Sequence, residues 1–113
     1  MSSEKRNELS VFFHMLYELN KGLRNLALLT TPVENRELIE ERLEKCGYES
    51  ITEELKSGYI NIFFGNSEPI KVLKKFKKQS LKEYTAEEDF ILGILLGYNT
   101  QQQCKRYLTR KAG

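Results

Sequence analysis

Few side chains in this sequence have the types and spacing that reaction chemistry needs. His14 is the only histidine, and the surrounding segment VFFHMLY offers no acid or thiol at metal-ligand spacing. Cys104 precedes Lys105 and Arg106, whose positive charges favour the thiolate form of a nearby thiol. We keep His14 and Cys104 as candidate ligand-binding or reactive residues. The alternatives are a partly buried histidine and a cysteine that packs as a small hydrophobe.

A lysine-rich segment, KVLKKFKK, is the most distinctive feature of the predicted surface. Its helical spacing exposes a basic face, for which we predict partner binding through Lys71, Lys74, Lys75 and Lys78. Residues 1–65 hold 8 Lys and Arg against 11 Asp and Glu, a net charge of −3, whereas residues 66–113 hold 10 against 5, a net charge of +5. The alternative is a solvated face, neutralised by the Glu-rich helix of residues 34–44 if the two helices pack side by side.

No motif in the sequence specifies a reaction. The acids Glu87, Glu88 and Asp89 resemble a general-acid group, but the positive end of a helix dipole explains acids in a first turn. Cys46 and Cys104 lie far apart without a CxxC motif, and no glycine-rich phosphate loop is present. We therefore predict no metal, no cofactor and no catalytic residue, and we favour a non-enzymatic protein.

The segment SGYINIFF shares part of the pattern of an RNA-recognition strand. Gly58, Tyr59, Ile62 and Phe64 fit that pattern, whereas Asn61 stands where an aromatic residue would stack on a base. Nucleic-acid binding through the basic helix is therefore kept only as a third hypothesis.

The elements that must position these residues are clearest at the C-terminus. Thr85 and Glu88 form a capping box, which predicts a helix through the apolar segment 90–96 that ends at Gly97. Asn99 can cap a second helix, so we expect a C-terminal helical hairpin. The 90–96 helix is apolar around its circumference, and it packs either in the core or in a subunit interface. So much apolar helix in a small domain also predicts a homodimer.

The N-terminal half is harder to read. Segment 10–19 suits either a helix or a buried strand, and we choose the strand because Gly22 can then close a hairpin with residues 23–30. A helix follows to Gly47, and a weaker strand, which could also be a helical turn, covers residues 50–57. Segments beginning at Gly22 and Gly58 share a glycine, an asparagine three residues later and a following helix. We interpret this similarity as a duplicated unit of two strands and a helix, and chance similarity is the alternative.

These elements predict an α+β fold. We expect a four-stranded antiparallel sheet from two ββα units, with the helices on one face and the C-terminal helical hairpin attached. With 113 residues and 40% hydrophobic content, the chain fits one domain, residues 1–113, and we expect residues 1–8 to be disordered. The polar start is unlike a signal peptide and the apolar run is too short to span a membrane, so we expect a cytoplasmic protein without membrane contact.

Three segments together carry a family resemblance: FFHMLYELNKGLRNLALLT, GYINIFFG and EEDFILGILLGYNTQQQCKRYL. They resemble a small bacterial family of uncharacterised proteins, known only as a domain of unknown function, over most of the chain. The family has no assigned activity, so the resemblance implies no site residue. Its members are often encoded beside a flavodoxin, which implies a role near flavin-based electron transfer.

Two main functional hypotheses follow. The first is a cytoplasmic adaptor or regulatory protein that uses the lysine face to bind an acidic protein partner such as flavodoxin. The second is a small ligand-binding domain or enzyme with a cleft near His14.

Overall fold

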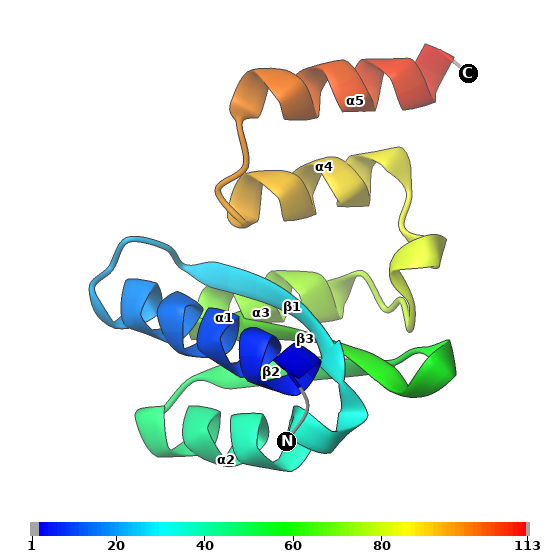
Figure 1. Cartoon of the computed structure of the whole chain (residues 1–113). Coiled ribbons are helices and arrows are strands. Elements are labelled where there is room, and N and C mark those ends of the chain that lie inside the picture. Colours follow the sequence, from blue (N-terminus) through cyan, green and yellow to red (C-terminus); the bar gives the residue numbers. More distant parts are fainter. Residues whose placement is uncertain (1–2, 113) are drawn as a thin grey trace.

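The computed structural model describes residues 3–112, with side chains from residue 8 onward, and has three strands and five α-helices in this region (Figure 1). The strands form one antiparallel sheet in the order β1-β3-β2. The elements are α1 (Ser3–Asn20), β1 (Leu26–Pro32), α2 (Arg36–Cys46), β2 (Glu49–Glu54), β3 (Tyr59–Gly65), α3 (Ser67–Lys75), α4 (Ala86–Leu95) and α5 (Thr100–Ala112). Single 3-10 turns are η1 (Val33–Asn35), η2 (Lys56–Gly58) and η3 (Leu81–Glu83).

The predicted four-stranded sheet is wrong, because segment 10–19 is part of helix α1. Leu9, Phe12, Leu16 and Leu19 are buried at spacings of three and four, whereas Phe13 and His14 are exposed. This is the pattern of an amphipathic helix with one face on a core. The aromatic content that favoured a strand is only a local preference, and burial of the helical stripe overrides it.

The duplicated ββα unit is therefore also wrong. The first of the similar segments leads into β1, and the second covers most of β3. These two strands pair directly with each other, and each leads into a helix. The elements before the two strands differ, however, because helix α1 precedes β1 whereas strand β2 precedes β3. The shared residues reflect two strand-to-helix passages rather than two copies of one unit.

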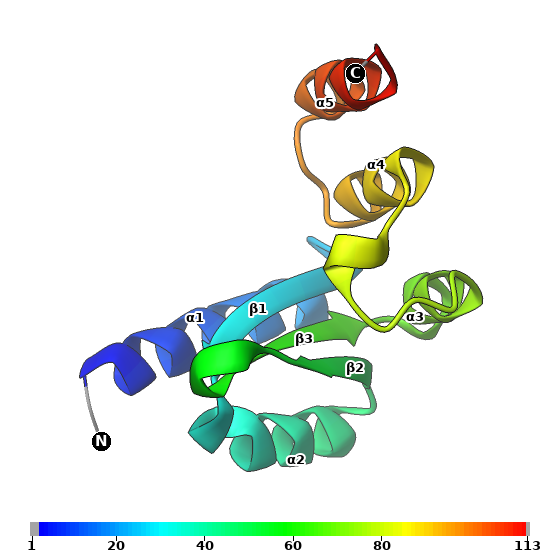
Figure 2. The same ribbon diagram turned by 90° about the vertical axis from the view of Figure 1, so that its right-hand side faces the viewer.

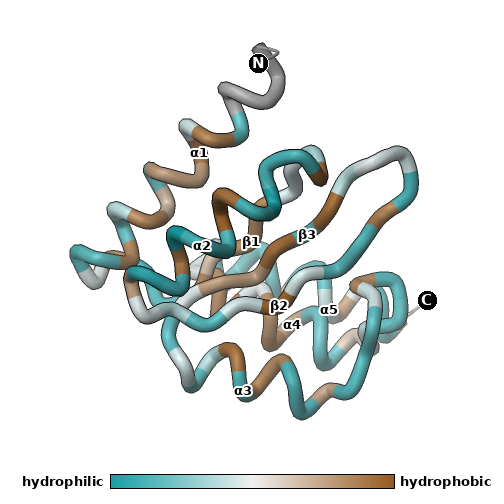
Figure 3. Tube along the Cα trace, turned by 90° about the horizontal axis from the view of Figure 1, so that it is seen from below, coloured by the Kyte–Doolittle hydropathy of each residue, from teal (hydrophilic) through white to brown (hydrophobic). Residues whose placement is uncertain are grey.

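The helices cover both faces of the sheet, which corrects the prediction that they lie on one face (Figure 2). One core joins α1 and α2 to Ala27 and Leu29 of β1 and to the β3 residues Ile60, Ile62 and Phe64. The second core joins α3 and α4 to the opposite side of the sheet through Leu26 and Phe63. Strand β3 is buried on both sides, and it is hydrophobic along most of its length in Figure 3.

The predicted C-terminal hairpin is present. Thr85 Oγ1 accepts the backbone N–H of Glu88 at 3.1 Å, and the Glu88 carboxylate accepts the N–H of Thr85 at 3.0 Å. Gly97 follows α4 with a φ of 82°, and Asn99 accepts the N–H of Gln102 at 3.0 Å at the start of α5. The caps read from the sequence therefore set the start of both helices and the end of α4.

Two further predictions concern the ends and the surroundings of the chain. The disordered segment 1–8 stays a prediction, because residues 1 and 2 lie outside the described residues and side chains are described only from residue 8. Among the helices of the described region, none combines the length and the apolar character that crossing a membrane requires.

Candidate functional site

His14 lies on the outer side of α1. Its side chain is 73% exposed, and its Nε2 is 3.8 Å from a carboxylate oxygen of Glu18, one helical turn further on. The hollows described below are lined by other residues. The geometry offers no support for a cleft near His14.

Cys104 is half-buried on α5, and Cys46 is exposed at the end of α2. The two thiols are therefore on separate elements and both are free. Among the side chains of residues 8–112, no group of three or more His, Cys, Asp or Glu residues is arranged to hold a metal ion.

The four lysines predicted to bind a partner have two different surroundings. Lys71 and Lys75 are exposed on α3 and form no ion pair with any described residue. Lys74 is 55% exposed and lies 3.9 Å from Glu49 of β2. Lys78, by contrast, donates to Glu88 at 2.9 Å and is 27% exposed, so it connects the segment after α3 to the first turn of α4.

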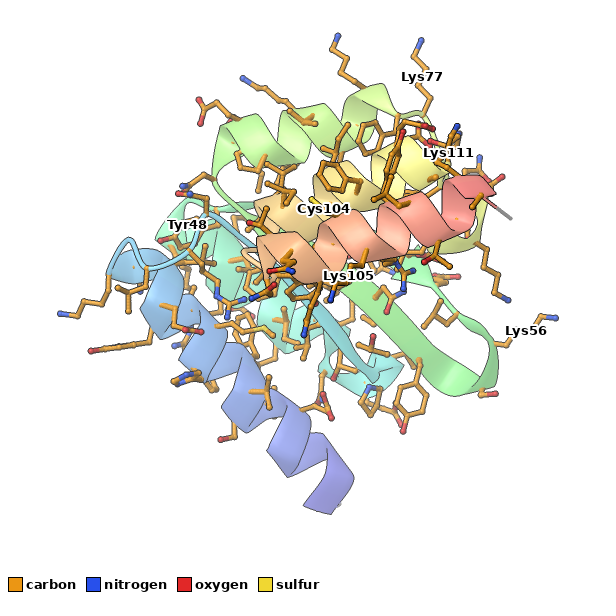
Figure 4. The ribbon with its side chains drawn as sticks, turned by 90° about the horizontal axis from the view of Figure 1, so that it is seen from above. Tyr48, Lys56, Lys77, Cys104, Lys105 and Lys111 are labelled. Atoms are coloured by element: carbon orange, nitrogen blue, oxygen red, sulfur yellow. The ribbon has the colours of Figure 1, made fainter. Side chains whose placement is uncertain are left out.

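The acidic helix α2 does not neutralise the lysine face. It packs on the α1 side of the sheet, whereas α3 packs on the opposite side (Figure 2). The exposed acids of α2, which are Glu37, Glu41 and Glu44, are thus separated from Lys71 and Lys75 by the sheet. Lys77, which follows α3, also points away from the ribbon in Figure 4. The charge asymmetry of the sequence becomes an asymmetry between the two faces of the fold.

The cations of α5 are used within the hairpin. Arg106 forms a bidentate pair with Asp89 at 2.7 and 3.1 Å, and Lys111 lies 3.0 Å from a Glu87 carboxylate oxygen that also accepts the hydroxyl of Tyr107 at 3.0 Å. Lys111 and Tyr107 stabilise the carboxylate and hold the pKa of Glu87 below its usual 4.5. The same contacts raise the pKa of Lys111 above 10.5 and that of Tyr107 above 10.0. No residue of α5 is fully buried, and these polar contacts join it to α4 together with the ring contact between Phe90 and Tyr107.

Helix α4 packs largely within its own chain. Leu92 and Leu96 belong to the second core, and a Cβ added to Gly93 would meet the Gln103 side chain of α5. Ile91 and Ile94, three residues apart on one face, are each 38% exposed. This face is the part of α4 that a second molecule could cover, and the homodimer stays a prediction.

Sequence reasoning missed a polar cluster at the end of α3. Tyr84 and Glu53 line a hollow of about 330 Å³ together with Lys78. Burial, followed by the negative charges of Glu88 and Glu53, raises the pKa of the Tyr84 hydroxyl above 10.0. No local motif could have indicated this cluster, because its members come from β2, from the segment after α3 and from the segment before α4.

Comparisons with known proteins identify the family of the chain. No curated protein shows significant similarity to the chain. A family model described as "Protein of unknown function (DUF2023)" matches residues 10–110. The match begins inside α1, ends inside α5 and includes all elements between them. The resemblance to a domain-of-unknown-function family is thereby confirmed. The chain belongs to the DUF2023 family of proteins of unknown function.

Proposed function

We propose that this protein is a non-enzymatic cytoplasmic adaptor or regulatory protein that binds an acidic protein through the exposed lysines of α3. One observation carries the proposal: the sheet separates Lys71 and Lys75 from the acidic α2, and neither lysine has an ion-pair partner in the described part of the chain. Lysines placed in this way create a positive potential over one face of the molecule.

Such a face acts mainly on encounter and orientation. Complementary charges increase the association rate and suppress wrong orientations, while exposed pairs contribute little affinity each. The exposed apolar side chains of the neighbouring α4, Ile91 and Ile94, supply contact area that lysines do not. Flavodoxin is the first partner to test, because flavodoxins are typically acidic and the family resemblance implies a role near them.

The test compares two double variants with equal change of net charge. Lys71→Glu with Lys75→Glu reverses the α3 face, and Lys21→Glu with Lys45→Glu makes the same change at the ends of α1 and α2. Binding to flavodoxin is measured by calorimetry, and the association rate by biosensor at several salt concentrations. We expect the α3 pair to lose on the order of tenfold in affinity and most of the salt dependence.

Equal loss from both double variants, or an affinity that neither variant changes, refutes the proposal. Lys78 is left unchanged in this design, because Lys78→Glu would place a carboxylate beside Glu88 and disturb the contact between α3 and α4. Absence of binding by the unmodified chain removes flavodoxin as the partner, and the same variants then test other acidic proteins.

The other two hypotheses receive less support from the geometry. A ligand-binding domain or enzyme near His14 would need a cleft, whereas the imidazole is on an exposed helix face. Nucleic-acid binding would use the same lysines as the adaptor, and it predicts a steep loss of affinity with salt for any nucleic acid, without preference for an acidic protein.

A further inference from the structure

The outer edge of β2 is a row of backbone groups that β3 does not use. Leu55 donates its N–H to the carbonyl of Tyr59 at 2.9 Å, and these residues continue the β2–β3 register by one pair. Hydrogen-bonded pairs alternate along an antiparallel ladder, so the next bonded residue on β2 is Glu53. The N–H and C=O groups that point away from β3 therefore belong to Ser50, Thr52 and Glu54. Because β2 ends the strand order β1-β3-β2, these groups face the free edge of the sheet.

A groove runs along this edge. One hollow, of about 330 Å³, lies against Ile51, Phe63 and Leu73, and a second, of about 510 Å³, continues to Leu55 and Lys56. The two hollows share four lining residues, so they form one continuous groove, with β2 on one side and residues 78–82 on the other. An apolar floor beside unused backbone donors and acceptors is the arrangement that binds an added strand.

The charge of the groove selects for an acidic occupant. Its walls contain four lysines, Lys56, Lys74, Lys78 and Lys82, against two acids. Lys78 is paired with Glu88 and Lys74 lies 3.9 Å from Glu49, so Lys56 and Lys82 are the groove lysines without an ion pair among the described residues. Of the two acids, Glu53 already accepts the backbone N–H of Leu81 at 3.3 Å and an amide N–H of Asn61 at 3.4 Å. A bound segment therefore meets lysines along the side of the groove that faces away from α2.

A second copy of this chain fits the same edge poorly. Antiparallel pairing of β2 with its symmetry mate extends the sheet without exchanging its faces. It would bring the acidic α2 beside the α2 of the other copy, since α2 lies against β2 through the contacts Glu40 with Thr52 and Arg36 with Glu54. It would likewise bring α3, with its lysines, beside the other α3. Repulsion on both faces opposes this pairing.

We propose that the β2 groove binds an extended acidic segment of another protein, which adds as a fourth strand to the sheet. The backbone of the segment pairs with Ser50, Thr52 and Glu54, its acidic side chains contact the groove lysines, and its apolar side chains reach Ile51 and Leu73. This inference goes beyond the lysine face of α3, because it rests on the sheet edge and does not involve Lys71 or Lys75.

The test uses the ¹⁵N-labelled full chain and a blocked peptide as long as β2, six residues, of alternating Glu and Val. Amide hydrogen exchange reports directly on the three edge N–H groups. When the peptide is present at about ten times its Kd, we expect exchange at Ser50, Thr52 and Glu54 to slow by about tenfold, in proportion to the bound fraction. Exchange in β3 should stay unchanged.

Two control peptides separate the contributions. A peptide with Lys in place of Glu keeps the backbone and reverses the charge, and a peptide methylated at alternate backbone nitrogens keeps the charge and removes the donors. We expect neither to slow exchange at the edge. Slowing by the methylated peptide would show electrostatic attraction without strand addition, and the proposal would then be wrong.

Protein variants test the same site from the other side. Ser50→Pro removes an outward N–H without breaking a bond to β3. Lys74→Glu with Lys82→Glu reverses the groove charge, and this second variant tests the site even if the proline variant does not fold. Both should abolish the effect of the peptide, whereas Lys71→Glu with Lys75→Glu should retain it. The chain without peptide could instead form a dimer in which the edge amides of β2 are already protected from exchange. If Ser50→Pro dissociates such a dimer, β2 pairs with a second copy of the chain and the proposal is wrong. If Lys71→Glu with Lys75→Glu leaves binding to flavodoxin unchanged while the peptide results are as expected, only the proposed adaptor function is wrong.

Discussion

Gly65, the last residue of β3, is the position where one added methyl group should cost the most. Its φ is +155°, and a Cβ built there lies 2.3 Å from the carbonyl oxygen of Asn25 and 3.0 Å from the Cα of Leu26. These are backbone atoms, and they cannot rotate away as the end of a flexible side chain could. The same carbonyl accepts the N–H of Asn66 at 2.9 Å, so moving it also strains the end of the β1–β3 ladder.

The expected cost of Gly65→Ala is the sum of two effects. A positive φ costs a non-glycine residue roughly 1–3 kcal/mol, and overpacking of a well-packed site costs a further 1–3 kcal/mol. The variant should therefore lose about 2–6 kcal/mol of unfolding free energy. This is a large fraction of the roughly 5–15 kcal/mol by which domains of this kind are stable.

Gly58→Ala is the matched control. Gly58 also has a positive φ, +77°, but a Cβ there would meet no atom within 4 Å. Gly58→Ala should therefore lose only the roughly 1–3 kcal/mol of unfolding free energy that a positive φ costs. Urea unfolding of both variants, followed by circular dichroism, gives the two free energies, and equal m-values show that the unfolded states are comparable. If Gly65→Ala costs no more than Gly58→Ala, the backbone contact with Asn25 does not constrain this position and the reasoning is wrong.

Three further predictions concern the polar contacts. The attachment of α5 should be strongest at intermediate pH, because the lowered pKa of Glu87 means stability lost as pH falls below about 4.5 and the raised pKa of Lys111 means stability lost as pH rises beyond 10.5. Carbon-13 heteronuclear NOE values at the Cα groups of α5, whose protons do not exchange with water, should therefore drop at both extremes while those of α1 hold. Lys78→Met should lower the urea midpoint by more than Lys75→Met, because only Lys78 contacts Glu88. We expect Lys75→Met to change the unfolding free energy by no more than about 0.5 kcal/mol, and equal midpoints for the two variants would contradict this reasoning. His14→Ala should change unfolding free energy by no more than about 0.5 kcal/mol, and a larger loss measured by urea unfolding would show an unrecognised role.

The sequence determined the features that depend on neighbours along the chain. Thr85 with Glu88, Gly97 and Asn99 specified the helical hairpin, because caps act through backbone groups within a few residues. The strand of residues 59–65 and the helices that follow β1 and β3 were also readable, since turn residues and apolar runs mark them. The lysine spacing correctly indicated an exposed face on α3.

Tertiary structure decided the features that depend on distant parts of the chain. The apolar residues of α1 are buried as a helical stripe because a sheet face with the complementary shape is available, and local composition alone pointed to a strand. Whether lysines are paired is likewise a property of the packing: Lys78 meets Glu88 across ten residues, whereas the sheet separates Lys71 and Lys75 from the acids of α2. The edge groove could not be read from the sequence for the same reason. The strand order left β2 at the edge, and the segment after α3 supplied the opposite wall.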